Sequence, residues 1–259
     1  MGLQALFDTL REMPVYRHIV DSLSGNRSEL VTVPDAAKPY VLGALWNELG
    51  RPMMIVCPRP EDARNLMDQL AIYCGENAPI KLFGESEILP FQRLAFDSAI
   101  AHQRLAVLAR LAPRVSNDSS GPPLIVTSAM GLMQKTLAPD LMERLIHTIR
   151  VGDQVTLEPL LQHWVRMGYR AAPNVDEPGT VSRRGGIIDI YTPGISFPVR
   201  IELLGNRIDA LRLFDPTSQR SIRAIDAVTV LPALEVLPSL TDHRLVDGLL
   251  RSIDYSNST

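Results

Sequence analysis

Two arginines stand out among the residues that could do chemistry, because each lies in a short segment with the alternation of a strand. Arg184 precedes Gly185-Gly186-Ile187-Ile188-Asp189, and Arg200 opens Arg200-Ile201-Glu202-Leu203-Leu204. Alternate side chains of a strand point to opposite faces, so Ile201 and Leu203 share a core face, whereas Arg200, Glu202 and Leu204 share the other. The outer face therefore combines an apolar residue with charges, which suits a small docking patch, although single exposed leucines are common.

The same arginines also have a plainer interpretation. Arg184 and Arg200 can pair with Glu202, Asp189 or Asp209 on their own sheet, where exposed ion pairs contribute little. Asp189 interrupts two apolar residues, but no histidine, serine or second acid stands beside it in a recognisable arrangement. We interpret it as a solvent-facing or salt-bridged strand residue rather than a catalytic carboxylate.

A second candidate is nucleotide binding by residues 32–39. A working P-loop has the pattern G-x-x-x-x-G-K-[ST], whose glycine amides wrap the phosphates while lysine reaches them and the hydroxyl holds magnesium. Here Lys38 falls at the lysine position, but the other requirements fail. The departures are Thr32 and Ala37 at the glycines, the acidic Asp35, and Pro39 in place of the hydroxyl residue. We predict a degenerate P-loop and no cofactor in this chain; residual nucleotide hydrolysis would depend on Lys38 alone.

Composition bounds the remaining classes of function. With 26 basic and 29 acidic residues, the net charge of -3 gives no broad footprint for nonspecific DNA binding. The histidines show no ligand spacing with one another or with Cys57 and Cys74, so no metal site is expected. Both cysteines have apolar neighbours, as buried thiols do, and neither a signal peptide nor an apolar run of about 18 residues is present. We expect a cytoplasmic protein without membrane contact.

The first half of the chain alternates short apolar runs with amphipathic ones. Four apolar runs are predicted as buried strands, because each is continuous and bounded by proline, glycine or charge. They are Leu30 to Val33, Met53 to Val56, Ile80 to Phe83 and Leu124 to Thr127. Helices are predicted from Pro60 to Gly75 and from about Ser98 to Leu111, the second with His102, Arg104 and Arg110 largely outward. This alternation predicts an α/β fold with a parallel sheet and helices on both faces.

The pattern changes after the polar, turn-rich loop from Val115 to Pro123 and the strand that follows it. One clear helix, Leu157 to Met167, precedes short alternating runs from Tyr169 to Val230, which are typical of an α+β domain with a mainly antiparallel sheet. Gly205-Asn206 predicts a tight hairpin, and the imperfect alternation from Ile208 to Phe214 leaves room for a bulge.

Two domains are therefore expected. Residues 1–136 would form the degenerate P-loop-like α/β domain and residues 137–230 the smaller α+β domain. Residues 231–259 would return to the first domain, with a helix near 241–253. Because the tail stops without a closing element, we expect a piece of a longer protein.

Several separated motifs occur in an order that is typical of one group of proteins. They are Glu177-Pro178-Gly179, the run from Arg184 to Asp189, Arg200-Ile201-Glu202, Phe214-Asp215 and Gln219-Arg220-Ser221. Together they resemble the second domain shared by bacterial transcription-repair coupling factors and the excision-repair subunit UvrB. Leu89-Pro90-Phe91, the run Gln103 to Leu108 and the run Thr127 to Gln134 resemble the first domain of the coupling factors. The resemblance covers most of the chain.

The resemblance implies the N-terminal module of a large ATP-driven DNA translocase. Such a protein finds RNA polymerase stalled at a lesion, dislodges it, and recruits UvrA through its second domain for nucleotide excision repair. The motor and polymerase-binding domains, with their ATP and magnesium, would lie outside this chain. That leaves a non-catalytic module whose partners are UvrA and the other domains of the same parent chain. UvrB keeps an intact P-loop, so the degenerate one favours the coupling factors.

The family's pattern also assigns the residues that contact UvrA, here Arg184, Arg200 and Leu204. The third position is often phenylalanine, so Leu204 would keep an apolar contact but lose ring area. Ser182 stands where UvrB has a further arginine, and Arg183 should point to the opposite side of the strand. With the resemblance, we favour UvrA binding over internal pairing. The alternative is a UvrB-like DNA-binding module, but the Tyr-rich insertion of UvrB is missing and no strong DNA binding is expected.

Overall fold

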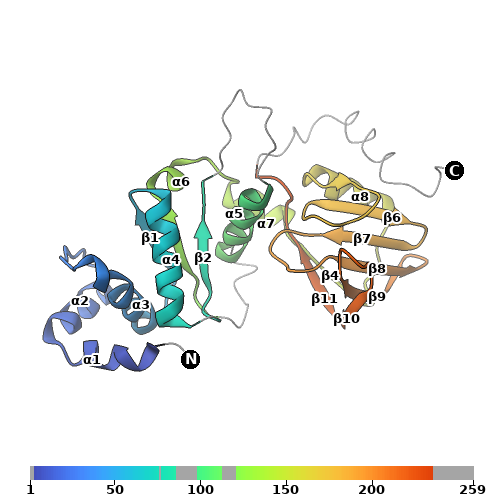
Figure 1. The fold of residues 1–259 in the computed structure, drawn as a ribbon. Helices are drawn as coiled ribbons and strands as arrows, with labels where there is room; N and C mark the ends of the chain where they lie inside the picture. The colour runs from blue at the N-terminus through green and yellow to red at the C-terminus, as the bar shows by residue number, and fades with distance from the viewer. Residues whose placement is uncertain (1–2, 76, 86–97, 113–120, 236–259) are drawn as a thin grey trace. The chain divides into compact units, whose positions relative to one another are not determined.

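The chain folds into two compact units (Figure 1). The computed structural model describes residues 3–75, 77–85, 98–112 and 121–235. The first unit comprises Met1–Ser86 with Asn117–Gln134, and the second comprises Glu87–Ser116 with Lys135–Thr259. The chain thus passes from one unit to the other three times. The helix at 98–111, which the sequence reading placed in the first domain, belongs to the second unit.

The first unit is built on a three-stranded parallel sheet in the order β1-β3-β2. Its elements are η1 (Leu3–Leu6), α1 (Phe7–Arg11), α2 (Pro14–Ser24), η2 (Asp35–Ala37), α3 (Lys38–Leu49), β1 (Met53–Cys57), α4 (Pro60–Cys74), β2 (Ile80–Phe83), β3 (Leu124–Ser128) and α6 (Ala129–Met133). Helix α4 has Pro60 at its start, and Gly75, with φ +94°, follows its end. Its buried Ala63, Leu70 and Cys74 pack with the sheet, as the sequence predicts.

Two strand predictions in this unit need correction. The strand predicted at Leu30–Val33 is wrong, since residues 27–34 form no helix or strand and Leu30 is almost fully exposed. A β-branched run is buried only where a neighbouring strand accepts it, and none of the described strands pairs with this one. The strand β1 exists as predicted but is not buried on both faces, because Met54 and Val56 are exposed. Among the described strands of this unit, only β3 is buried throughout.

The second unit contains a six-stranded sheet in the order β10-β9-β8-β7-β6-β5, which is antiparallel except between β5 and β6. The predicted α+β class with a mainly antiparallel sheet is confirmed. A two-stranded sheet pairs β11 with β4. The elements are α5 (Ser98–Leu111), α7 (Pro139–Leu145), β4 (His147–Arg150), α8 (Leu157–Arg166), β5 (Arg170–Ala171), β6 (Thr180–Arg184), β7 (Ile187–Tyr191), β8 (Val199–Leu204), β9 (Arg207–Phe214), β10 (Ser221–Ile225) and β11 (Ala227–Val230).

The core of the second unit lies on the inner face of the large sheet. Trp164 of α8 is fully buried there among Ile188, Ile190 and Ile201, so the predicted helix and the predicted core-facing side of β8 are both confirmed. Its indole N–H donates to Nε2 of His147, 3.0 Å away. The predicted binding residues lie on the opposite, outer face of these strands.

Helix α5 joins this unit through a second cluster and a buried ion pair. Its Leu105 packs with residues of α7 and with Leu231. Arg104 is fully buried and donates from Nε and Nη2 to the Glu235 carboxylate at 2.7 and 3.0 Å. The prediction that His102 and Arg104 point outward is therefore wrong, because both side chains are buried.

Some predictions fall on parts of the chain outside the described residues. They are the Leu89-Pro90-Phe91 motif, most of the 115–123 loop and the helix near 241–253. Among the helices that the structure does describe, none has the length and hydropathy to cross a membrane.

Candidate functional site

Two hairpins of the large sheet carry the predicted binding residues, with Arg184 and Leu204 next to the turns and Arg200 near the start of β8. The turn Gly185-Gly186 joins β6 to β7, and Gly205-Asn206 joins β8 to β9. Gly185 and Gly205 have φ +61° and +63°, a conformation that favours glycine. The amide of Leu203 donates to the carbonyl oxygen of Gly186 at 2.8 Å, so the two hairpin ends are tied together.

A bulge in β9 explains the imperfect alternation of its sequence. Glu202 pairs with Ala210 and Leu203 with Ile208, so Asp209 has no partner in β8. The extra residue returns Ile208 to the core face after Leu211. The predicted hairpin and bulge are both confirmed, and the outer face keeps Arg200, Glu202 and Leu204 together.

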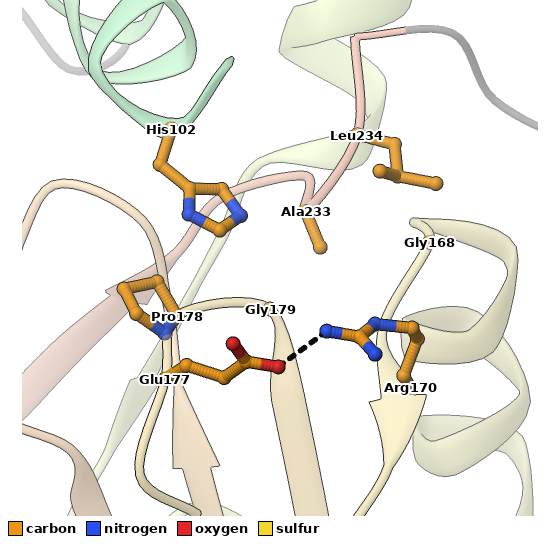
Figure 2. A pocket seen from close by; sticks show the side chains of 8 residues that line it. All are labelled: His102, Gly168, Arg170, Glu177, Pro178, Gly179, Ala233 and Leu234. Atoms are coloured by element: carbon orange, nitrogen blue, oxygen red, sulfur yellow. Dashed lines mark hydrogen bonds and ion pairs between the residues drawn. The ribbon is translucent and has the colours of Figure 1, made fainter. Parts of the chain in front are cut away.

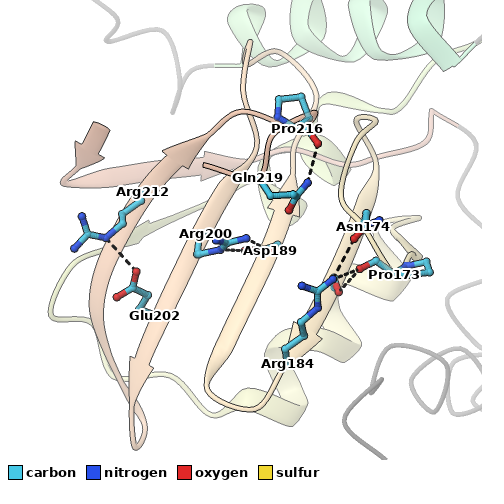
Figure 3. A network of polar contacts seen from close by, with 10 residues as sticks. Pro173, Asn174, Arg184, Asp189, Arg200, Glu202, Arg212, Pro216 and Gln219 are labelled. Carbon is cyan, nitrogen blue, oxygen red and sulfur yellow. Dashed lines mark hydrogen bonds and ion pairs between the residues drawn. The ribbon is translucent and has the colours of Figure 1, made fainter. Parts of the chain in front are cut away.

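Arg184 ends β6 on the outer face and is exposed. Its Nη2 donates to the carbonyl oxygen of Pro173 at 2.7 Å and to Oδ1 of Asn174 at 3.1 Å (Figure 3). Both acceptors are neutral, and among the described residues no carboxylate pairs with this guanidinium. Arg184 therefore keeps its charge uncompensated while its side chain is held in place.

Arg200 is in a different environment, at the level of Asp189 on β7, whereas Arg184 is at the level of Ile187. Its Nε and Nη2 each lie 2.8 Å from an oxygen of Asp189, directly across from it on β7 (Figure 3). The side chain is only 21% exposed, and its guanidinium carbon lies 4.7 Å from the centre of the Phe214 ring. Hydrogen bonding to Asp189 raises the pKa of Arg200 above its ordinary value. The plainer interpretation, internal pairing, thus describes Arg200.

The bidentate pair with Asp189 does not use all of the N–H donors of Arg200. A guanidinium has five N–H donors, and Asp189 takes two of them on one edge. The remaining donors belong to the other edge of the group. Arg200 can thus offer hydrogen bonds to a partner without giving up Asp189, although as a neutralised ion pair it offers less net charge than Arg184.

Leu204 is 73% exposed. It lies at the end of β8, paired with Arg207 across the hairpin. Beside it on the outer face, Glu202 accepts a hydrogen bond of 3.0 Å from Nε of Arg212, and both side chains are exposed (Figure 3). The amino-acid sequence alone does not predict this pair, because the face that Arg212 occupies depends on the bulge.

The residues after β9 form a loop with several internal hydrogen bonds. Oδ1 of Asp215 accepts from the amides of Thr217 and Ser218 at 3.0 and 2.7 Å, and these bonds, that from Ser218 first, lower the pKa of Asp215. Gln219 has φ +59°, and its Nε2 donates to the carbonyl oxygen of Pro216 at 2.7 Å (Figure 3). This loop follows Phe214, which is fully buried beneath Arg200. Phe214 therefore packs under the outer face, and the loop that follows it is held by its own hydrogen bonds.

The segment of the predicted degenerate P-loop lies in the first unit. Thr32 is in the stretch without regular structure, Ala37 ends η2, and Lys38 and Pro39 begin α3. Nζ of Lys38 lies 2.6 Å from Oδ1 of Asp35, which raises the pKa of Lys38. No described strand precedes the segment, so the strand-loop-helix arrangement of a P-loop is not found here.

A pocket of about 510 Å³ lies within the second unit (Figure 2). Its eight lining residues are His102, Gly168, Arg170, Glu177, Pro178, Gly179, Ala233 and Leu234. Burial lowers the pKa of His102, and Arg170 pairs with Glu177 across the pocket. None of these lining residues is a serine, threonine or cysteine that the histidine could activate. Across the described residues, no group of three or more His, Cys, Asp or Glu could hold a metal ion.

The hairpins lie within a recognised domain. Residues 147–235 match the family described as the UvrB interaction domain. The chain is 34% identical over 233 residues to the transcription-repair-coupling factor of Myxococcus xanthus, an alignment that covers 88% of this chain and 19% of that protein. This chain is a homologue of the transcription-repair-coupling factors. The coupling factor of Bacillus subtilis (strain 168) is 27% identical over 231 residues, again 88% of this chain and 19% of the relative.

The chain spans about a fifth of the length of these coupling factors. It is also 22% identical over 238 residues to the UvrABC system protein B of Thermosipho africanus (strain TCF52B), covering 87% of this chain and 35% of that protein. The family that the separated motifs predicted is therefore confirmed.

Proposed function

We propose that this chain is the UvrA-docking module of a transcription-repair-coupling factor, with β6, β7 and β8 presenting the docking surface. The observation that carries the proposal is the match of residues 147–235 to the UvrB interaction domain. Within that range, Arg184 combines exposure with an uncompensated charge, and Leu204 adds exposed apolar area at the same end of the strands. Arginine is typical of residues that dominate interface energies, and apolar contacts around such a residue exclude water.

In the parent protein, the module would bring UvrA to RNA polymerase stalled at a lesion. ATP-driven translocation on DNA, and polymerase contact, would belong to the larger part of the protein beyond this chain. The module itself would bind no nucleotide, since Lys38 is paired with Asp35 and neither a glycine-rich loop nor a magnesium-binding hydroxyl accompanies it.

The test is binding of purified bacterial UvrA to the purified chain and to its Arg184→Glu variant. Reversing the charge should weaken binding by at least about thirtyfold, the effect expected for an interface anchor worth about 2 kcal/mol. Because the guanidinium is exposed, the unfolding midpoint should barely change. Arg223→Glu, on the exposed edge strand β10, is the matched control and should bind normally.

Arg200 needs a gentler change, because glutamate there would face the buried Asp189. Arg200→Gln paired with Asp189→Asn removes both charges together and should weaken binding less than Arg184→Glu does. Absence of binding by the unchanged chain would refute the docking function. Normal binding by Arg184→Glu would refute the assigned surface.

A further inference from the structure

Ile187 is an exposed apolar residue at the centre of the proposed docking surface. It opens β7 directly after the Gly185-Gly186 turn and is 41% exposed. The register pairs it with Arg184 on one side and with Glu202 on the other, so all three share the outer face. An exposed β-branched residue between two charged ones has no part in the core, whose nearest member on β7 is Ile188.

Ile187 and Leu204 lie close enough to act on one partner side chain. Leu204 is two residues beyond Glu202 on the same face, which makes it the diagonal neighbour of Ile187. Such diagonal neighbours in antiparallel strands are about 7 to 8 Å apart, within reach of one apolar group placed over both. The hydrogen bond from Leu203 to Gly186 keeps the strand ends in this arrangement.

The charges around this apolar pair are uneven. Arg200 and Arg212 are each paired with a carboxylate, whereas Arg184 contacts only the neutral oxygens of Pro173 and Asn174 among the described residues. The exposed Arg207 lies across the hairpin from Leu204, and Arg184 places an uncompensated positive charge beside Ile187. A partner surface that complements it has a carboxylate next to an apolar side chain.

We infer that Ile187 is a specificity-determining contact of the docking surface. The apolar side chain of the partner packs on Ile187 and Leu204, while its carboxylate pairs with Arg184. This inference rests on the proposed docking function.

The experiment measures UvrA binding kinetics and their salt dependence for Ile187→Thr and its control. Ile187→Thr keeps a β-branched side chain but removes apolar area, so binding should weaken about fivefold through faster dissociation. The slope of affinity against salt should stay unchanged, whereas Arg184→Gln should lower it. Ile187→Val should lower the logarithm of the affinity for UvrA about half as much as Ile187→Thr does. Ile222→Thr on β10, where isoleucine is 47% exposed at the far edge of the sheet, should bind normally.

The outcomes separate this inference from the proposal on which it rests. If the unchanged chain does not bind UvrA, both are overturned. If it binds and Ile187→Thr binds equally well, only the role of Ile187 is overturned. Self-association that Ile187→Thr abolishes, with UvrA binding intact, would assign this face to a second copy of the chain and also overturn the inference. If Ile187→Thr lowers the unfolding midpoint, the binding of Ile187→Val replaces it as the test, and an unchanged affinity of Ile187→Val overturns the role of Ile187.

Discussion

Replacing Glu235 with alanine should destabilise the second unit far more than replacing an exposed glutamate does. Glu235 accepts two hydrogen bonds from Arg104, whose side chain is 0% exposed, while that of Glu235 is 9% exposed. Removing this carboxylate takes two charge-assisted hydrogen bonds from a fully buried guanidinium, which typically costs about 3 kcal/mol or more. The Thr136 hydroxyl also loses its acceptor, but it is exposed and water can replace that bond.

The matched control is Glu202→Ala, which removes the same side chain from the exposed pair with Arg212. Exposed pairs contribute about 1 kcal/mol or less. The two variants should therefore differ by at least about 2 kcal/mol, or roughly thirtyfold in the ratio of folded to unfolded protein. Glu235→Gln, which keeps hydrogen-bonding capacity but not the charge, should fall between them.

Chemical denaturation followed by fluorescence of Trp164 reports on this unit alone in a Trp46→Phe background, because the chain has two tryptophans. Trp46 belongs to the core of the first unit and Trp164 to that of the second. An equal loss of stability for Glu235→Ala and Glu202→Ala would refute the argument that burial decides the contribution of these pairs.

Two further predictions concern protonation and nucleotides. Burial lowers the pKa of His147, whose Nε2 accepts from Trp164, so the unfolded state binds the proton more readily. The contribution of His147 to the free energy of unfolding is therefore complete above the unfolded pKa of about 6.5 and decreases as the pH falls below it. His147→Gln should reduce the difference between the denaturation midpoints measured at pH 7.5 and pH 5.5. Calorimetric titration with magnesium-ATP should show no binding; micromolar affinity would contradict the assignment of residues 32–39.

Patterns that depend on near neighbours were predictable from the sequence. The helix α4 has its own start and stop signals at Pro60 and Gly75, and both hairpins are marked by glycine at the turn. The exposure of Leu204 and the burial of Ile201 follow from alternation along a single strand. These features need no knowledge of distant parts of the chain.

Features that depend on distant residues were not predictable in this way. Arg104 is typical of a solvent-facing helix position until Glu235, 131 residues later, is placed against it. The partner of Arg200 was one of several open choices, because only the β7 to β8 register selects Asp189. Leu30 to Val33 has the composition of a strand, yet composition cannot supply the neighbour that a strand requires.

The central place of β3 makes the two units depend on each other through chain connectivity. This strand pairs with both β1 and β2, yet it reaches them only after the chain has contributed α5 to the second unit. A chain cut between residues 86 and 87 would therefore yield two polypeptides that remain associated, since the second piece carries the middle strand of the first piece's sheet. Likewise, residues 147–235 expressed alone would lack α5 and the partner of Glu235. The matched range 147–235 is thus shorter than the second compact unit of the structure.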